Sequence, residues 1–198
     1  KTRRGFLPLA YRAMLLNPRR LSRYASLAAL LKKTGLSRMA SLAGGGLARA
    51  EGLLPETPVE PLQSRIKGLD LTPSSVRGRV AYFMGCGSNY LFPDVGEATI
   101  RVLVASGYGV EVTRNYCCGL PPHTSGDLST ARRLAKGNLR LLDFQEVDAV
   151  VTDCASCSSF LKSYPDLLGE DSRFSKQAAG LAGKVLDITE FLYRLGPT

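Results

Sequence analysis

The residues from Arg79 onward predict an α/β domain in which helices cover both faces of a parallel sheet. Short apolar runs alternate there with longer segments of helical periodicity, as is typical of parallel strands joined by helices. Each of the three expected strands also leads into a segment that contains cysteine. We therefore expect a three-layer fold with the cysteines at the carboxyl ends of its strands, and a basic helical arm in front of it.

The first fifty residues contain eleven Lys and Arg and no Asp or Glu, which accounts for the net charge of +9. Asn17-Pro18 predicts a helix N-cap followed by proline at the first helical position. Apolar residues recur at helical spacing up to Lys33, and a weaker helix is expected from Leu36 to the glycines at 44–46. We expect a helical basic arm over 1–51, a proline-rich linker over 52–78, and a cysteine-rich domain over 79–198.

The elements expected in the domain follow from the change between strand and helix periodicity. Apolar runs bounded by glycine or polar residues predict strands, and longer periodic segments predict helices. The expected strands are 80–84, 109–113 and 148–152, and the expected helices are 93–105, 127–144 and 158–168, with further helical stretches to Leu195.

All five cysteines lie within this alternating region: Cys86, Cys117, Cys118, Cys154 and Cys157. An odd number does not fit a closed disulfide framework, so we expect a reducing compartment, the cytoplasm. In open α/β sheets, ligands bind outside the carboxyl ends of the strands. Three separate stretches of sequence should therefore bring their thiols to one place.

The spacing of the cysteines indicates a metal or redox site. Cys154-x-x-Cys157 places two thiols on one turn, and a following helix N-terminus favours thiolate. Cys117 and Cys118 are adjacent, which suits two irons of one cluster better than one ion, and Gly119 after them can adopt positive φ. Structural zinc, a thioredoxin-like dithiol and simple burial of apolar thiols remain as alternatives.

The pattern Cys86-x30-Cys117-Cys118-Gly119-x34-Cys154-x2-Cys157 resembles the cysteine-rich CCG domain. This domain occurs in heterodisulfide reductase and in iron–sulfur subunits of glycolate oxidase and lactate-utilisation systems. The segments 92–99 and 125–127 also resemble the glycolate oxidase subunit. The resemblance implies an iron–sulfur protein, with a [4Fe-4S] cluster of the noncubane type where all five cysteines are present. Two departures are a first gap shorter than the family's usual range and the presence of one such domain without a ferredoxin motif.

We therefore expect a non-catalytic, electron-carrying subunit or fragment of a multi-subunit oxidoreductase, acting with a 2-hydroxy-acid dehydrogenase or a heterodisulfide-reductase-like system. Its partners would be a flavoprotein dehydrogenase subunit or further iron–sulfur domains. The alternatives are a zinc-binding structural or assembly module and a thiol–disulfide redox protein.

Three further features leave more than one interpretation. The basic arm can be a solvated helical face, a docking surface for a partner, or a peripheral contact with anionic lipid at the inner face of a membrane. Nucleic acid is not expected, because aromatic residues are sparse in the arm. His123, the only histidine, is either a donor to the site or a loop residue without a role, and Asp153 is interpreted as a turn or cap residue.

Overall fold

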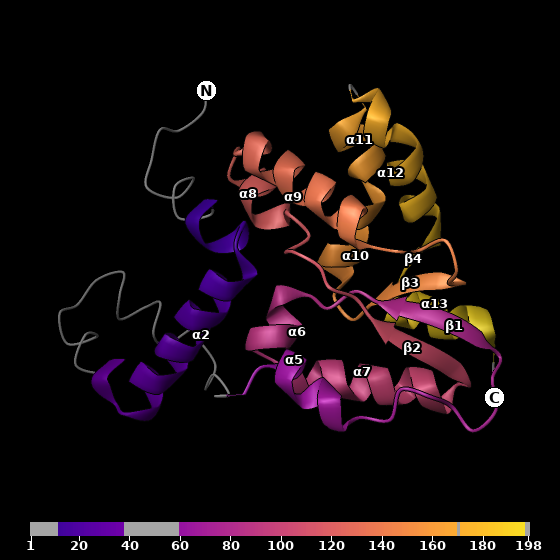
Figure 1. Ribbon diagram of the computed structural model, residues 1–198, viewed down its shortest axis with the longest axis horizontal. Helices are drawn as coiled ribbons and strands as arrows, with labels where there is room; N and C mark the ends of the chain where they lie inside the picture. The colour runs from indigo at the N-terminus through magenta and orange to yellow at the C-terminus, as the bar shows by residue number, and fades with distance from the viewer. Residues whose placement is uncertain (1–11, 38–59, 170, 197–198) are drawn as a thin grey trace.

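The computed structural model describes residues 12–37, 60–169 and 171–196. Within them a four-stranded, fully parallel sheet forms the centre of the domain (Figure 1). The strands lie in the order β2-β1-β3-β4, with β1 Gly78–Tyr82, β2 Tyr108–Val112, β3 Ala149–Thr152 and β4 Val185–Asp187. The parallel α/β fold expected from the sequence is confirmed.

Alternate residues of each strand point to opposite faces of the sheet, and each face has its own apolar core. Ala81, Phe83 and Val150 belong to one core, here called the α9-side core. Val80 and Val151 belong to the other, here called the α7-side core. Both faces are therefore buried, as the short continuous apolar runs of the strands predicted.

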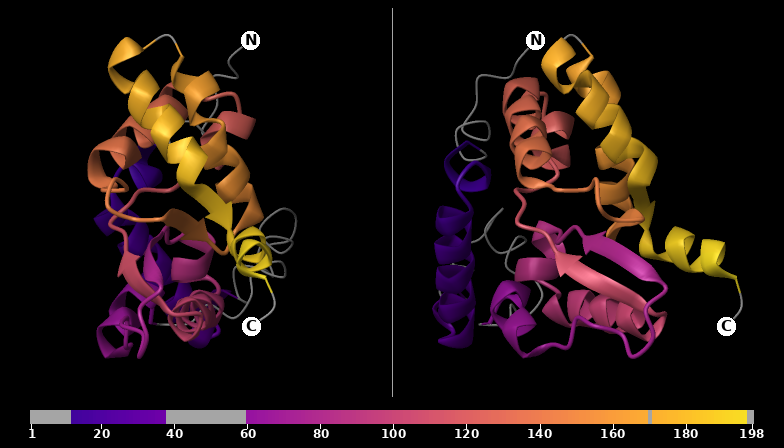
Figure 2. Two further views of the ribbon diagram at one scale, coloured as in Figure 1. Left: turned by 90° about the vertical axis from the view of Figure 1, so that its right-hand side faces the viewer. Right: turned by 45° about the vertical axis from the view of Figure 1, so that its right-hand side comes forward.

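Helices cover the two faces as separate layers (Figures 1 and 2). The α7-side layer contains α5 Leu62–Arg65, α7 Pro93–Ala105 and α13 Ile188–Leu195. The α9-side layer contains α9 Leu128–Leu141, α10 Ala155–Lys162, α11 Tyr164–Leu168 and α12 Ser172–Lys184. Two short helices, α6 Cys86–Tyr90 and α8 Leu120–Thr124, occupy loops that follow β1 and β2.

Strand β4 and the two short helices were not predicted from the sequence. Strand β4 has only three residues and directly follows α12, so periodicity alone extended the helix through it. The side chain of Lys184 fixes this junction, because its Nζ donates to the carbonyls of Phe144, Gln145 and Val147 at 2.9, 3.0 and 2.8 Å.

The helix expected over 158–168 is also different in the structure. It begins three residues earlier, at Ala155, so Cys157 lies in the first turn of α10 rather than before it. It then divides into α10 and α11 at Ser163, because Pro165 lacks the N–H that a continuous helix needs at that position.

The arm contributes helix α2, Pro18–Lys33, which runs along one side of the domain (Figure 2). Its predicted cap is confirmed, since the Asn17 side chain accepts from the Arg20 amide at 3.2 Å. Ahead of it, a helical turn over 12–15 contacts the domain: Leu15 packs on the α9-side core, and the Arg12 guanidinium donates to Ser129 at 2.7 Å. No described helix is both long enough and apolar enough to cross a bilayer.

Part of the expected linker is folded. Residues 62–68 form α5 and a 3-10 turn, η1 Ile66–Gly68, and Leu62 is fully buried in the α7-side core. Most of the weaker helix expected from Leu36, and residues 52–59 of the linker, lie outside the described residues.

Candidate metal centre

The cysteines follow the carboxyl ends of three neighbouring strands. Cys86 begins α6 after β1, and Cys117 and Cys118 follow β2. Cys154 is the N-cap residue of α10 after β3, and Cys157 lies in the first turn of that helix. The chain leaves β1 for β2 on one side and returns to β3 on the other, so the crevice between β1 and β3 is the topological switch point of the sheet.

The five thiols, here called the string of thiols, interact in the pairs Cys86–Cys117, Cys117–Cys118, Cys118–Cys157 and Cys157–Cys154. The Sγ atoms of Cys86 and Cys117 are 4.0 Å apart. Cys118 interacts with both Cys117 and Cys157, and Cys157 also interacts with Cys154. All five are free thiols. In the described part of the chain, no three His, Cys, Asp or Glu side chains form a group around the position of a single ion.

Hydrogen bonds along this string differentiate the thiols. Hydrogen bonds from the Cys117 and Cys157 thiols lower the pKa of Cys118 to about 4, with the backbone around Leu120 and Gly119 helping. Its two neighbours donate these bonds, and donation together with burial raises the pKa of Cys117 and of Cys157. Cys118 is therefore the thiol held most firmly as thiolate.

Two buried polar side chains hold the Cys117–Cys118 peptide units. Asn138 Nδ2 from α9 donates to the Cys117 carbonyl at 3.1 Å and to the Tyr164 hydroxyl at 3.0 Å. The Tyr164 hydroxyl from α11 donates to the Cys118 carbonyl at 2.6 Å. Asn138 Oδ1 accepts from the Tyr116 amide at 2.7 Å. Both side chains are 0 % exposed, so the two cysteines are fixed by groups that belong to the core.

Sequence reasoning did not identify Asn138 or Tyr164 as part of the site. One signal was available: Asn138 shares a helix face with Ala131, Leu134 and Ala135, where a polar residue has to find a buried partner. The partner itself was not visible, because Tyr164 lies 26 residues further along the chain.

Gly119 ends the paired cysteines in the left-handed conformation expected of it, with φ of 103°. A Cβ there would also meet Phe160 Cε1 at 3.1 Å. The His123 ring packs against Phe160, with 5.0 Å between the two ring centroids. His123 is exposed.

A cavity of about 270 Å³ adjoins the string of thiols at Cys86 and Cys117. The arm supplies part of its wall through Leu15, Pro18 and Leu21, and its other lining residues include Tyr90, Arg114, Asn115 and Tyr116. Cys86 and Cys117 therefore border a cavity between the site and the arm.

Comparison with known proteins agrees with this arrangement. Residues 80–162 match the family described as cysteine-rich domain, CCG. The matched segment includes all five cysteines. The chain is similar to a probable glycolate oxidase iron–sulfur subunit of Bacillus subtilis (strain 168), with 29% identity over 194 residues, covering 94% of this chain and 44% of that protein.

Two other relatives match the cysteine-rich part. Lactate utilization protein A of Bacillus pumilus (strain SAFR-032) is 36% identical over 115 residues, 58% of this chain and 48% of that protein. An uncharacterized iron–sulfur protein of Methanococcus maripaludis is 38% identical over 119 residues, 60% of this chain and 22% of that protein. The chain thus spans less than half the length of these curated relatives. No solved structure matches it.

Proposed function

We propose that the five cysteines hold an iron–sulfur cluster and that the domain carries electrons in an oxidoreductase complex, because residues 80–162 match the cysteine-rich CCG family. The observation that most directly supports this is the string of five thiols from three segments at one edge of the sheet. A zinc ion takes four ligands around one point. A string of thiols suits a group with several metal atoms.

The donor set fits such a group. All five thiols are free, Cys118 favours the thiolate form that ligation requires, and Asn138 and Tyr164 fix the adjacent carbonyls without occupying any sulfur. Five thiols exceed the four of a cubane site, which supports a noncubane [4Fe-4S] cluster. When bound, the cluster supplies reversible one-electron chemistry. We propose residues 79–198 as the unit that holds it.

Single cysteine-to-serine variants test the ligand set. Serine at Cys86, Cys117, Cys118, Cys154 or Cys157 should lower the iron and acid-labile sulfide bound per chain after anaerobic reconstitution, because each removes one thiolate donor. Ser156→Ala is the matched control, since Ser156 is exposed between Cys154 and Cys157 and should keep full iron. Full iron in three or more serine variants would refute a shared site. Stoichiometric zinc with no iron in the wild-type chain would favour the structural zinc module instead.

The likeness to glycolate oxidase and lactate utilization proteins supports a role beside a dehydrogenase that oxidises a small 2-hydroxy acid. The flavin chemistry would belong to a partner protein, and this chain would accept electrons from it in the cytoplasm. We expect no turnover of lactate or glycolate with an artificial acceptor by the reconstituted chain alone. Cluster reduction should require both substrate and the flavoprotein, and turnover by this chain alone would overturn its role as a carrier.

The arm offers a surface for that partner. Helix α2 exposes Tyr24, Leu27 and Leu30, with no acidic residue and with the exposed cations Arg19, Arg20 and Arg23 beside them. An acidic protein surface is the complement of this face. Replacing the three arginines by glutamine should slow cluster reduction by the flavoprotein and make its rate less dependent on salt, while leaving iron content unchanged. If the variant's rate of cluster reduction at low salt equals that of wild type, the arm is not part of the docking surface.

A further inference from the structure

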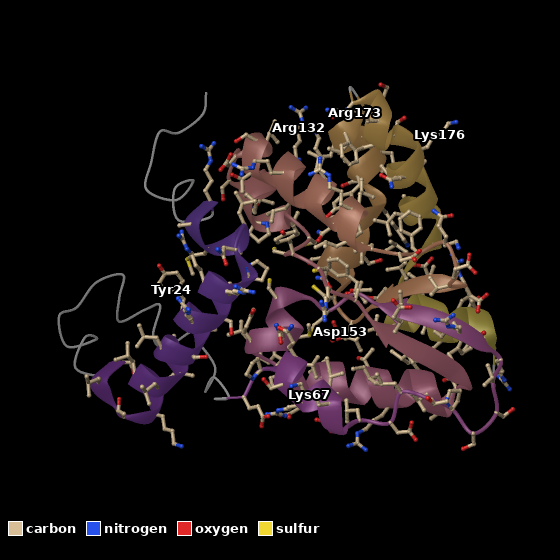
Figure 3. All side chains as sticks on the ribbon, viewed as in Figure 1. Tyr24, Lys67, Arg132, Asp153, Arg173 and Lys176 are labelled. Atoms are coloured by element: carbon tan, nitrogen blue, oxygen red, sulfur yellow. The ribbon has the colours of Figure 1, made fainter. Side chains whose placement is uncertain are left out.

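Asp153 joins two of the cysteine segments. It lies in the bend between β3 and α10, directly before Cys154, at the centre of the molecule (Figure 3). One carboxylate oxygen accepts from the Ser88 hydroxyl at 2.7 Å, and the other accepts from the Tyr82 hydroxyl at 2.8 Å. Ser88 lies two residues after Cys86, and Tyr82 ends β1. Of the two roles expected for Asp153, turn or cap, the structure shows the turn, because the N-cap of α10 is Cys154.

The two donors are themselves fixed. Tyr82 is 0 % exposed, pairs in register with Val112 and Val151, and accepts at its carbonyl from Thr113 Oγ1 at 3.0 Å. A Cβ at Gly96 would approach the Tyr82 hydroxyl to 2.9 Å, so the hydroxyl is closely packed. Ser88 is 7 % exposed. Burial, and then the nearby Asp153 carboxylate, raise the pKa of Tyr82, so this hydroxyl stays protonated as a donor.

This geometry joins two cysteine segments. Hydrogen bonds to a carboxylate are shorter and stronger than those between neutral groups, so Asp153 fastens the Cys86 segment to the Cys154 segment across the switch point.

We propose that Asp153 is a positioning residue of the cysteine site, which fixes Cys86 relative to Cys154 through Ser88 and Tyr82. The proposal concerns the metal-free chain, so its test does not depend on the proposed cluster. Asparagine can keep both contacts, because its Oδ1 can accept from Tyr82 and its Nδ2 can donate to Ser88 Oγ. Alanine removes both hydrogen bonds.

The positioning is measured first in the metal-free chain, by hydrogen exchange of residues 84–92 under reducing conditions. The amides of Asn89, Leu91 and Phe92 report on α6, since they donate to Gly85 and Gly87 at 2.8–2.9 Å. Asp153→Ala should exchange several-fold faster there than wild type, and Asp153→Asn should restore most of the protection. Asp166→Ala, at an exposed aspartate of α11, is the control and should leave it unchanged.

Wild-type exchange in Asp153→Ala overturns the proposal, and so does exchange in Asp153→Asn that is as fast as in Asp153→Ala. If Asp153→Ala does not fold, faster exchange at 84–92 in Ser88→Ala supports the positioning and wild-type exchange there overturns it. Iron uptake is measured separately in the reconstituted chain. A wild-type chain that takes up no iron refutes the proposed function, and the metal-free exchange still decides the positioning.

Discussion

At the scale of single residues, the buried pair Asn138 and Tyr164 fixes the backbone of the two adjacent cysteines. The Tyr164 hydroxyl is the donor to the Cys118 carbonyl. Burial raises the pKa of Tyr164 well above that of a free tyrosine, so the hydroxyl stays protonated and remains a donor. A buried carbonyl that loses its donor cannot turn to water, and its desolvation is then uncompensated.

Tyr164→Phe tests this pair. The substitution keeps the ring that packs edge-on against Phe160 and removes only the hydroxyl. We expect it to lower the free energy of unfolding by about 1–3 kcal/mol, the usual cost of one unsatisfied buried polar group. Urea unfolding of the metal-free chain measures the change. Tyr193→Phe is the control, because Tyr193 is 87 % exposed and its hydroxyl should contribute almost nothing; equal values for the two variants would contradict the prediction.

The role of a residue could be predicted where it depends on the residue type and its neighbours in the sequence, and not where it depends on distant partners. The five cysteines were predictable because thiols clustered at strand ends are rare and strand ends converge in a parallel sheet. Gly119 was predictable because few other residues tolerate positive φ. The acceptor role of Asp153 was not, since its two donors lie 71 and 65 residues away and only the folded sheet brings them together.

At the scale of elements, the predictions succeeded where the chain carries its own start and stop signals. Helix α2 begins at the proline after Asn17, and α7 covers the expected residues 93–105. Helix α9 begins directly after Asp127, the first residue of the expected helix, and ends at Leu141, three residues before the expected end. The prediction failed at β4, where three residues are too few for a period to be recognised and the strand forms because β3 offers a free edge.

The cap of α9 yields a pH-dependent prediction. Asp127 Oδ1 accepts from the Thr130 amide at 3.1 Å, and Asp127 Oδ2 accepts from the Thr130 hydroxyl at 2.6 Å. Burial alone would raise the pKa of Asp127, but these hydrogen bonds, a further one from Ser129 and the Arg12 guanidinium outweigh it and lower the pKa. Asp127→Ala should therefore destabilise the chain by ~1 kcal/mol at neutral pH, as loss of a cap usually does.

The sign of the pH dependence follows from the lowered pKa. Asp127 is ionised in both states above the unfolded pKa of about 3.9, so its full contribution is present there. As the pH falls below that value toward the folded pKa, the unfolded chain binds the proton first and the contribution disappears. Urea unfolding of wild type and Asp127→Ala at pH 7, 4 and 3 measures the gap between their free energies of unfolding. This gap should narrow as the pH falls. A gap that widens in acid would contradict the assignment, and the exposed Asp166→Ala should show no comparable gap at any pH.

At the scale of the whole molecule, the site belongs to one of the two cores that lie on opposite faces of the sheet. The α7-side core contains no cysteine, whereas the α9-side core includes Cys117, Cys118 and Cys157 with Cys86 and Cys154 at its margin. The strand order that creates the crevice was not predictable, because apolar runs identify strands without specifying their neighbours. The predicted convergence of the thiols depended only on the strands being parallel, which the alternation of strands and helices indicated.

This division predicts how the metal-free chain behaves. Most of the apolar burial in both cores is independent of any cofactor, and such burial contributes about 25 cal/mol per Å². We therefore expect the chain to stay folded when iron is removed, with β1, β3 and α9 retaining slow hydrogen exchange. Protection from hydrogen exchange should fall only around the two partly exposed cysteines, Cys86 and Cys154. The affected segments would be residues 84–90 and 153–158.

Hydrogen exchange followed by mass spectrometry, on anaerobically reconstituted and metal-free protein at one pH, measures this difference. Residues 116–119 should change less than 84–90, because Asn138 and Tyr164 hold them whether or not metal is bound. Iron should also raise the midpoint of thermal unfolding, since a ligand that binds only the folded state stabilises it. Collapse of protection across β1 and α9 on iron removal would mean that the cores do not fold without the cofactor, as in small domains whose metal-binding energy is their folding energy.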